Sequence, residues 1–166
     1  MRMKKYKLMS IAGTICVVLV ILAAFPFTLP RIFGIEIYGI LTGSMDPACP
    51  TGSLVYVKSV NPESLQEKDI VTFQKGNLVI THRVVKNDVQ KEELITKGDA
   101  NNANDIQPVA YEQIKGKVAL TVPLLGYLAL RLNSAAGISV CVIILALGLM
   151  LWVLGDMMSI KKKSLS

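Results

Sequence analysis

Cysteine and histidine are nearly absent from the sequence. Its 166 residues include three cysteines and one histidine, His82. Cys16 and Cys141 fall in apolar runs, so only Cys49 lies in the polar middle of the chain. A single cysteine there can form neither an internal disulfide nor, by itself, a metal site. We therefore expect a domain without a disulfide, a metal or a cofactor.

The middle of the chain also lacks a surplus of charge. Between residues 31 and 131 there are 11 basic and 11 acidic side chains, although the whole chain carries a net charge of +6. The surplus comes from Asp156 and seven cations outside the apolar runs: Arg2, Lys4, Lys5, Lys7, Lys161, Lys162 and Lys163. This distribution argues against a nucleic-acid partner. Cations that flank apolar runs stay on the cytoplasmic side, so we expect both tails inside and the middle segment outside.

Two charge-free runs, residues 8–30 and 132–155, have 23 and 24 residues. Each exceeds the roughly 20 residues that cross a bilayer as a helix. The first run is too long for the usual core of a cleaved signal peptide, so we expect an uncleaved anchor. The second helix starts either near Leu124, with Arg131 reaching toward the interface, or at Leu132. The expected segments are tails 1–7 and 156–166, a membrane helix 8–30, a β domain 31–123 and a C-terminal hydrophobic segment 124–155 with a second membrane helix.

Between the runs, short stretches with β-branched residues are separated by turn residues. The expected strands cover residues 35–40, 53–60, 69–73, 78–86, 93–97 and 116–122. No convincing soluble helix lies between them. The pattern predicts an all-β extracytoplasmic domain, an antiparallel sheet or a partly closed barrel, flanked by two transmembrane α-helices.

Three places in the middle segment carry groups suited to acyl transfer. Ser44 lies in a turn between Gly43 and Met45, and His82 lies in an expected strand, where histidine can accept a proton near neutral pH. The polar loop 98–108 contains Asp99 and Asp105. A nucleophile, a general base and an orienting carboxylate could come from these places.

Plainer interpretations exist for each of these residues. A serine in a turn is usually a loop residue, and a lone histidine is often a half-buried sheet residue. Asp99 fits an Asx turn, and Asp105 fits a solvated loop charge. With Asn101 the two aspartates could bind calcium, but the distal glutamate of a helix-flanked calcium loop is missing.

Other residues could replace the serine or the histidine. Cys49 is an alternative nucleophile, although Pro50 follows it directly. Lys75 and Lys86 are alternative bases, and a lysine base must be desolvated to lower its pKa. Lys75 lies beside a Gly-Asn turn, whereas Lys86 is harder to exclude.

Four blocks, taken together, resemble type I signal peptidase of the ER-type branch, as in spore-forming Gram-positive bacteria, archaea and the eukaryotic ER complex. Thr42-Gly43-Ser44-Met45-Asp46-Pro47 resembles the nucleophile box, and Lys68-Asp69-Ile70-Val71-Thr72-Phe73 resembles the following strand. Thr81-His82-Arg83-Val84-Val85 resembles the His-Arg-Val box, and Lys97 to Asp105 resembles the Lys-Gly-Asp-Asn box with its downstream aspartate. Thr42 replaces the usual serine and keeps the hydroxyl. Lys68 replaces a glycine, which puts the turn before that strand in doubt.

The resemblance implies roles for individual residues. Ser44 would be the nucleophile, His82 the general base and Asp105 the third member. Asp99 would be a supporting carboxylate, and the Thr42 hydroxyl would fall at the oxyanion hole.

The implied protein is a serine endopeptidase of the signal peptidase I type in the cell membrane, or in the ER membrane of a eukaryote, with its active site on the outer face. It would remove signal peptides from secretory preproteins after small residues at −1 and −3. The lipid bilayer and the secretion machinery are the other expected partners. The alternative is a non-catalytic, membrane-anchored β domain that binds extracellular partners.

Overall fold

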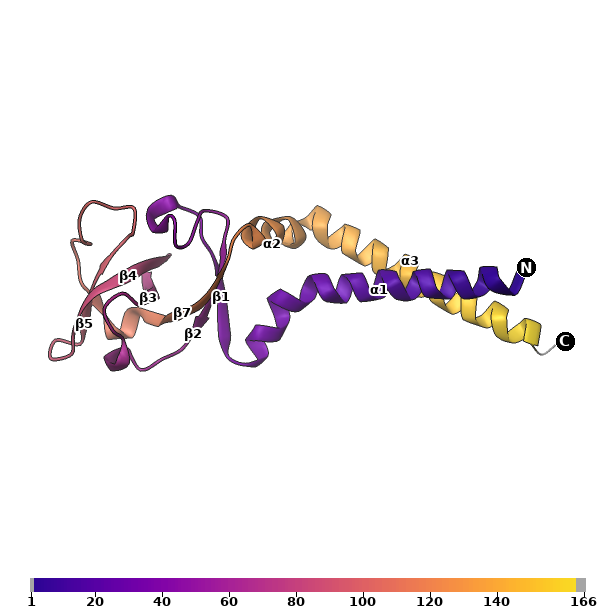
Figure 1. The fold of residues 1–166 in the computed structure, drawn as a ribbon, viewed down its shortest axis with the longest axis horizontal. Coiled ribbons are helices and arrows are strands. Elements are labelled where there is room, and N and C mark those ends of the chain that lie inside the picture. Colours follow the sequence, from indigo (N-terminus) through magenta and orange to yellow (C-terminus); the bar gives the residue numbers. More distant parts are fainter. Residues whose placement is uncertain (1, 164–166) are drawn as a thin grey trace. The chain divides into compact units, whose positions relative to one another are not determined.

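The computed structural model describes residues 2–163, with the side chains of residues 5–160 (Figure 1). The predicted tails lie partly outside this range, because residues 1 and 164–166 and the side chains of the terminal cations at 2, 4 and 161–163 are not described. The chain divides into two compact units, Met1–Thr28 with Leu130–Ser166, and Leu29–Ala129. The first unit is helical. The second contains the sheet and all four sequence blocks that carry the expected site residues.

The helical unit contains two helices long and apolar enough to cross a membrane. α1 runs from Arg2 to Ile32 and α3 from Ala135 to Lys163, and the apolar spans within them are Lys5–Ile32 and Ala135–Ile160. α1 continues through Pro26 and Pro30 and ends two residues beyond the expected membrane helix 8–30. Gly34, at φ +71°, follows its end, as glycine often does after a helix.

Glycines allow α1 and α3 to approach each other closely. A Cβ atom on Gly13 would lie 2.5 Å from the carbonyl oxygen of Gly148, and one on Gly148 would lie 2.9 Å from Cβ of Cys16. Near the other end of the contact, a Cβ on Gly155 would lie 2.7 Å from the backbone nitrogen of Ser10. Small residues at such contacts let helix backbones pack without intervening side chains, which is the usual arrangement in lipid.

The C-terminal segment begins with two helices instead of one. A short helix, α2, covers Leu125–Asn133, and α3 begins at Ala135. Ser134 separates them: its hydroxyl donates to the carbonyl of Arg131 and accepts from the N–H of Gly137. Serine is a favoured helix N-cap. The expected start near Leu124 lies next to the start of α2, whereas Leu132 falls inside α2 and the long helix begins three residues later, at Ala135.

The second unit contains a seven-stranded antiparallel sheet with the order β1-β2-β7-β3-β4-β5-β6. Its strands are β1 (Ile35–Gly39), β2 (Leu54–Lys58), β3 (Ile70–Lys75), β4 (Leu78–Asp88), β5 (Glu93–Lys97), β6 (Val109–Ala110) and β7 (Ile114–Val122). The predicted all-β domain between two long apolar helices is confirmed. The two-residue β6 was not expected, because two residues are too few to show alternation.

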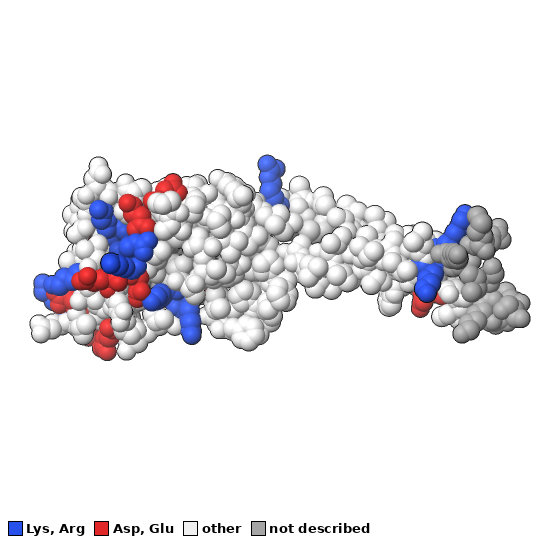
Figure 2. Space-filling view, in the orientation of Figure 1, with Lys and Arg blue, Asp and Glu red and all other residues white. Residues whose placement is uncertain are grey.

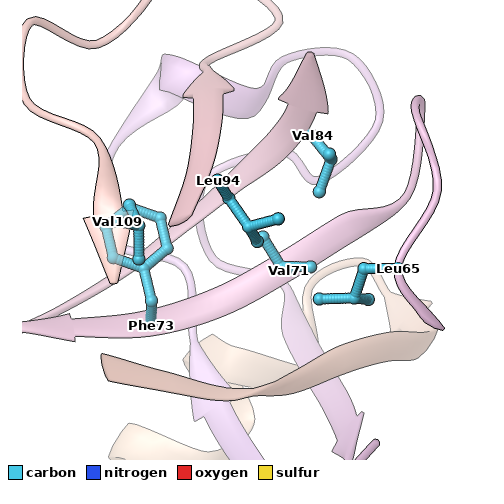
Figure 3. Packing of buried hydrophobic residues seen from close by; sticks show 6 residues of the cluster. All are labelled: Leu65, Val71, Phe73, Val84, Leu94 and Val109. Atoms are coloured by element: carbon cyan, nitrogen blue, oxygen red, sulfur yellow. The ribbon is translucent and has the colours of Figure 1, made fainter. Parts of the chain in front are cut away.

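Two apolar clusters hold the sheet. One is formed by Leu65, Val71, Phe73, Val84, Leu94 and Val109 (Figure 3). The other contains Ile40, Met45, Cys49, Val55 and Val57. The first cluster packs β3, β4 and β5 together, and the second packs the segment after β1 against β2. Each cluster therefore supports one of the two places from which the expected catalytic side chains project.

Charged side chains of the sheet unit are gathered on one part of its surface. In Figure 2 basic and acidic atoms intermingle there, and a broad uncharged surface covers the rest of the visible face of the domain. On this face both signs are mixed, in agreement with the neutral composition of residues 31–131.

Candidate active site

The serine turn follows β1 and forms a short 3₁₀ helix, Gly43–Met45. Met45, only 1% exposed, anchors the turn in the second apolar cluster. The carbonyl oxygen of Ser44 accepts a hydrogen bond from the N–H of Ala100 at 2.9 Å. A Cβ on Gly98 would lie 2.7 Å from the same oxygen, so the loop after β5 approaches the serine as closely as it does because residue 98 is glycine. The serine turn is thus held from two sides.

His82 lies on β4 and turns its imidazole toward that serine. Its Nε2 is 3.3 Å from Oγ of Ser44. The ring packs edge-on against Phe73, with ring centroids 6.2 Å apart, and the residue is 8% exposed. As alternation predicts, His82 shares a face of the strand with Ile80, while Thr81 points the other way and shares a buried hydrogen bond with Thr72. Strand pairing and the aromatic contact together fix the imidazole.

Asp105 lies against the other side of the imidazole. Its Oδ2 is 2.6 Å from Nδ1 of His82 and also accepts a hydrogen bond from the hydroxyl of Thr96 at 2.6 Å. The N–H of Asp105 donates to the carbonyl of Thr96 at 2.8 Å. The serine, the histidine and this aspartate, separated by up to 61 residues in the sequence, therefore meet in one hydrogen-bonded row. A hydroxyl, an imidazole and a carboxylate in this order have the arrangement that activates a serine for acyl transfer.

Asp99 does not touch the imidazole. It forms a two-pronged ion pair with Arg83, from Nε to Oδ1 at 2.7 Å and from Nη2 to Oδ2 at 2.6 Å. Hydrogen bonding to this carboxylate raises the pKa of the Arg83 guanidinium. Arg83 also donates to the carbonyl oxygen of Lys68 at 2.8 Å. The structure thus gives Asp99 a bracing position, because it joins loop 98–108 to β4 next to His82.

The turn before β3, where Lys68 replaces a glycine, is formed in the structure. The φ of Lys68 is +75°, in the left-handed region that favours glycine. The turn therefore keeps the backbone conformation that glycine would adopt most readily. The N–H of Lys68 donates to the carbonyl oxygen of Val84 at 2.9 Å, so the strained residue is fixed to β4.

The alternative nucleophile and bases lie in unsuitable surroundings. Cys49 is fully buried in the second apolar cluster, with Sγ 3.3 Å from the hydroxyl of Thr121. The side chain of Lys86 is 59% exposed and 3.5 Å from Asp88, and Lys75 is exposed as well. Neither lysine is desolvated as a neutral base would require. Among the described residues, no group of three or more His, Cys, Asp or Glu side chains could hold a metal ion.

Two cavities open beside this row of side chains. The first, which we call the serine-side cavity, has a volume of about 410 Å³ and is bounded by residues 38–42, Ser44, Met45 and residues 77–81. The second, the histidine-side cavity, has a volume of about 290 Å³. It is lined by Phe73, Lys75, Ile80, His82, Asn101, Ala103, Asn104, Asp105, Ile106 and Gln107. Of all these residues, Ile80 alone lines both cavities.

The serine-side cavity has the features of a peptide-binding cleft. Residues 78–82 of β4 lie outside the pairing with β5, which starts at Arg83, so this edge of the strand is open to an added strand. Thr42 also lines the cavity in an extended conformation, two residues before the serine. Tyr38 also lines the cavity, and its hydroxyl donates to a carboxylate oxygen of Glu36. Burial and this bond raise the pKa of Tyr38 to about 12, so the phenol stays protonated.

Two contributors to the site, Thr96 and Arg83, were not predicted from the sequence. Thr96 is an inward-facing threonine of β5, and Arg83 alternates with His82 on β4. The available signals were a hydroxyl just before the Lys-Gly-Asp turn and a cation next to the only histidine. Neither signal identifies a partner, because both partners lie in a loop whose path cannot be read from alternation.

Comparison with known proteins gives relatives of a single kind, although no family model matches the chain. The chain is 40% identical over 92 residues to signal peptidase I W of Bacillus subtilis (strain 168), which covers 53% of this chain and 48% of that protein. It is 35% identical over 118 residues to the signal peptidase complex catalytic subunit SEC11 of Ogataea parapolymorpha, covering 57% of this chain and 66% of that protein.

A third relative is the SEC11 subunit of Pyricularia oryzae, 35% identical over 109 residues, with 57% of this chain and 62% of that protein covered. The chain thus spans about half to two thirds of the length of the curated relatives it matches.

Proposed function

Because this chain is homologous to type I signal peptidases, we propose that it is a membrane-bound serine endopeptidase that removes signal peptides from exported preproteins. The observation that carries the proposal is the continuous row from Ser44 Oγ through the His82 imidazole to the Asp105 carboxylate, at 3.3 and 2.6 Å. A scaffold domain would have no need of this arrangement. The names of the relatives supply the substrate class.

In the proposed reaction, Nε2 of His82 takes the proton of the Ser44 hydroxyl as Oγ attacks the scissile carbonyl carbon. Asp105 keeps the Nδ1–H of the imidazole directed toward itself and stabilises the imidazolium. The N–H of Ser44 and the hydroxyl of Thr42 donate to the oxyanion of the tetrahedral intermediate. His82 then gives the proton to the leaving amine as the C–N bond breaks. A water deprotonated by His82 later attacks the ester carbonyl, the C–O bond to Ser44 breaks, and His82 returns the proton to Oγ.

Asp99 acts in this scheme as a supporting carboxylate through its pair with Arg83. Small residues at −1 and −3 of the substrate would enter the serine-side cavity, where Ile40, Met45 and Ile80 leave limited room beside the serine. The proposal requires no metal or cofactor.

We assign the segments to sides of the membrane on the basis of charge. Helices α1 and α3 would cross the cell membrane, or the ER membrane in a eukaryote, with tails 1–7 and 156–166 in the cytoplasm and the β domain 31–123 outside. Ser44 follows the end of α1 by twelve residues, which keeps it close to the bilayer in sequence. A serine near the membrane can reach a bond just beyond the apolar core of a tethered preprotein. Contact with the secretion machinery is part of the same proposal.

The test is cleavage of a tethered preprotein with alanine at −1 and −3, by the full chain in membranes. Ser44→Ala and His82→Ala should each lower kcat by about 10⁴-fold or more, as removal of a triad member does. Lys86→Ala is the matched control and should leave kcat unchanged, because that side chain is 59% exposed and paired with Asp88. Retained cleavage by His82→Ala, or its loss in Lys86→Ala, would refute the assigned base. No cleavage by the wild-type chain would favour the non-catalytic alternative.

A further inference from the structure

We propose that the histidine-side cavity binds the first residues of the mature protein, downstream of the scissile bond, and that Lys75 makes it favour acidic side chains there. This inference rests on the proposed function, and it deepens that function by assigning a second half to the substrate site. It follows from how the two cavities divide the catalytic row, and from the groups that line the second cavity.

The serine and the histidine of the catalytic row line different cavities, and this decides which part of a substrate enters each cavity. Ser44 lines the serine-side cavity alone, and His82 lines the histidine-side cavity alone. In acyl transfer the serine stays bonded to the acyl half, while the protonated imidazole delivers its proton to the leaving amine. The leaving half must therefore lie against the imidazole. The cavity built around His82 is the space next to that group.

The walls of the histidine-side cavity suit a short peptide segment. Phe73 and Ile80 form its floor on the sheet, and Ile106, which is fully exposed, stands in the loop that borders it. Three amide side chains, Asn101, Asn104 and Gln107, can donate to or accept from a peptide backbone. The volume of about 290 Å³ is at the lower limit of whole small-molecule sites, which is room for a few residues and not for a folded domain.

The charged groups of the cavity point to the side chains it favours. Its anion, Asp105, already accepts hydrogen bonds from His82 and Thr96. Its lysine, Lys75, is exposed and forms no ion pair with any of the residues that the structure describes. The free positive charge would pair with an aspartate or glutamate of the substrate. Lys75 pairs with Leu78 across the strands, four residues from His82, so an extended peptide reaches it about 14 Å from the imidazole, near +2 to +4.

The experiment measures kcat/KM of the full chain in membranes on a set of preproteins that share one signal peptide. Serine occupies positions +1 to +4 of the reference substrate, and aspartate or lysine is placed at each position in turn. At low ionic strength the wild-type chain should prefer aspartate over lysine by about two- to fivefold at one or more of positions +2 to +4, as an exposed ion pair allows. Lys75→Glu should invert that preference. Lys58→Glu, the same charge change on β2 and outside both cavities, should leave it as in the wild type.

Each outcome has a definite meaning. An unchanged preference at +2 to +4 in Lys75→Glu overturns the inference and leaves the proposed function intact. A second substrate set places aspartate or lysine at −2 to −4 of the signal peptide. If Lys75→Glu shifts the preference in that set instead, the cavity takes the signal-peptide half, which also overturns the inference. Failure of the wild-type chain to cleave the all-serine reference removes the proposed function itself, and the inference with it. Circular dichroism of Lys75→Glu shows that the sheet is intact.

Discussion

At the scale of single residues, the candidate site depends on hydrogen bonds that converge on one oxygen atom. Oδ2 of Asp105 accepts from both His82 and Thr96, and each distance is 2.6 Å. Thr96 is fully buried, so its hydroxyl has no access to water as a substitute partner. The threonine thereby fixes the orientation of the carboxylate that in turn orients the imidazole. We regard Thr96 as a positioning residue of the site.

Thr96→Val tests this assignment. Removal of a hydrogen bond to a charged group costs about 1.5–3 kcal/mol, so we expect kcat to fall by roughly 10- to 100-fold with little change in KM. The pH profile of kcat should shift as well, since the carboxylate facing the imidazole is altered. Thr96→Ser keeps the hydroxyl and should restore most of the activity and the wild-type profile. Equal losses in the two variants, or a loss confined to KM, would contradict the positioning role.

The same residues show what could be predicted from the sequence. Ser44, His82 and the two aspartates carry distinctive chemistry, and their types alone suggested a site. Thr96 and Arg83 act through partners in loop 98–108, and the path of a loop depends on tertiary contacts that alternation does not encode. Lys68 was identified as a departure from glycine. Only the structure shows why glycine suits this position, because the φ of residue 68 is +75°.

At the scale of elements, alternation and turn residues located six of the seven strands to within a few residues. β4 and β7 each extend about two residues beyond the expected range, because cross-strand pairing continues past the apolar pattern. The junction of α2 and α3 could not be decided from composition, since Arg131, Asn133 and Ser134 all interrupt the apolar stretch and only Ser134 acts as a cap. Pairing and capping are properties of neighbours, and the sequence of one segment does not contain them.

One contact between elements bears directly on the serine turn. The N–H of Gly126, at the start of α2, donates to the carbonyl oxygen of Gly52 at 2.9 Å. Gly52 in turn donates to Ile40 at 2.8 Å, and residues 40 and 52 bracket the turn that carries Ser44. A Cβ on Gly126 would lie 2.6 Å from that oxygen of Gly52 and 2.8 Å from the carbonyl oxygen of Ser53. The start of α2 therefore supports the base of the serine turn through Gly52.

Gly126→Val should disrupt this support. Overpacking of a buried contact costs about 1–3 kcal/mol, so we expect a lower free energy of unfolding of the full chain and faster hydrogen exchange at the amides of Ile40 and Gly52. Cleavage should slow, because the serine turn moves. Leu128→Val introduces the same β-branched residue at an exposed position of α2 and is the control. Exchange at the two amides as slow as in the wild type would refute the coupling.

At the scale of the whole molecule, charge is distributed by segment. The cations in excess lie outside the charge-free runs 8–30 and 132–155, while residues 31–131 are neutral and their charged side chains intermingle on the face seen in Figure 2. Cations flanking a span are retained on the cytoplasmic side, whereas a neutral segment between two spans is free to cross. The proposed orientation follows from this difference alone.

Cysteine labelling in intact cells checks the orientation. Lys91→Cys, in the exposed turn between β4 and β5, should react with a membrane-impermeant maleimide. Ser159→Cys, exposed near the end of α3, should react only after permeabilisation. The natural chain is the background control, because Cys49 is fully buried and Cys16 and Cys141 lie in the charge-free runs 8–30 and 132–155, whereas Ser159 follows the second run. The reverse pattern would place the β domain in the cytoplasm and exclude the proposed activity on exported preproteins.

Loop 98–105 supplies both the N–H that holds the carbonyl of Ser44 and the carboxylate that orients His82. During translation the ribosome delivers serine first, histidine 38 residues later and this loop last. A nascent chain that ends at residue 97 therefore contains the proposed nucleophile and base but lacks the loop that contacts both of them. Order of synthesis thus places the alignment of the proposed nucleophile and base after residue 105 has been added to the chain.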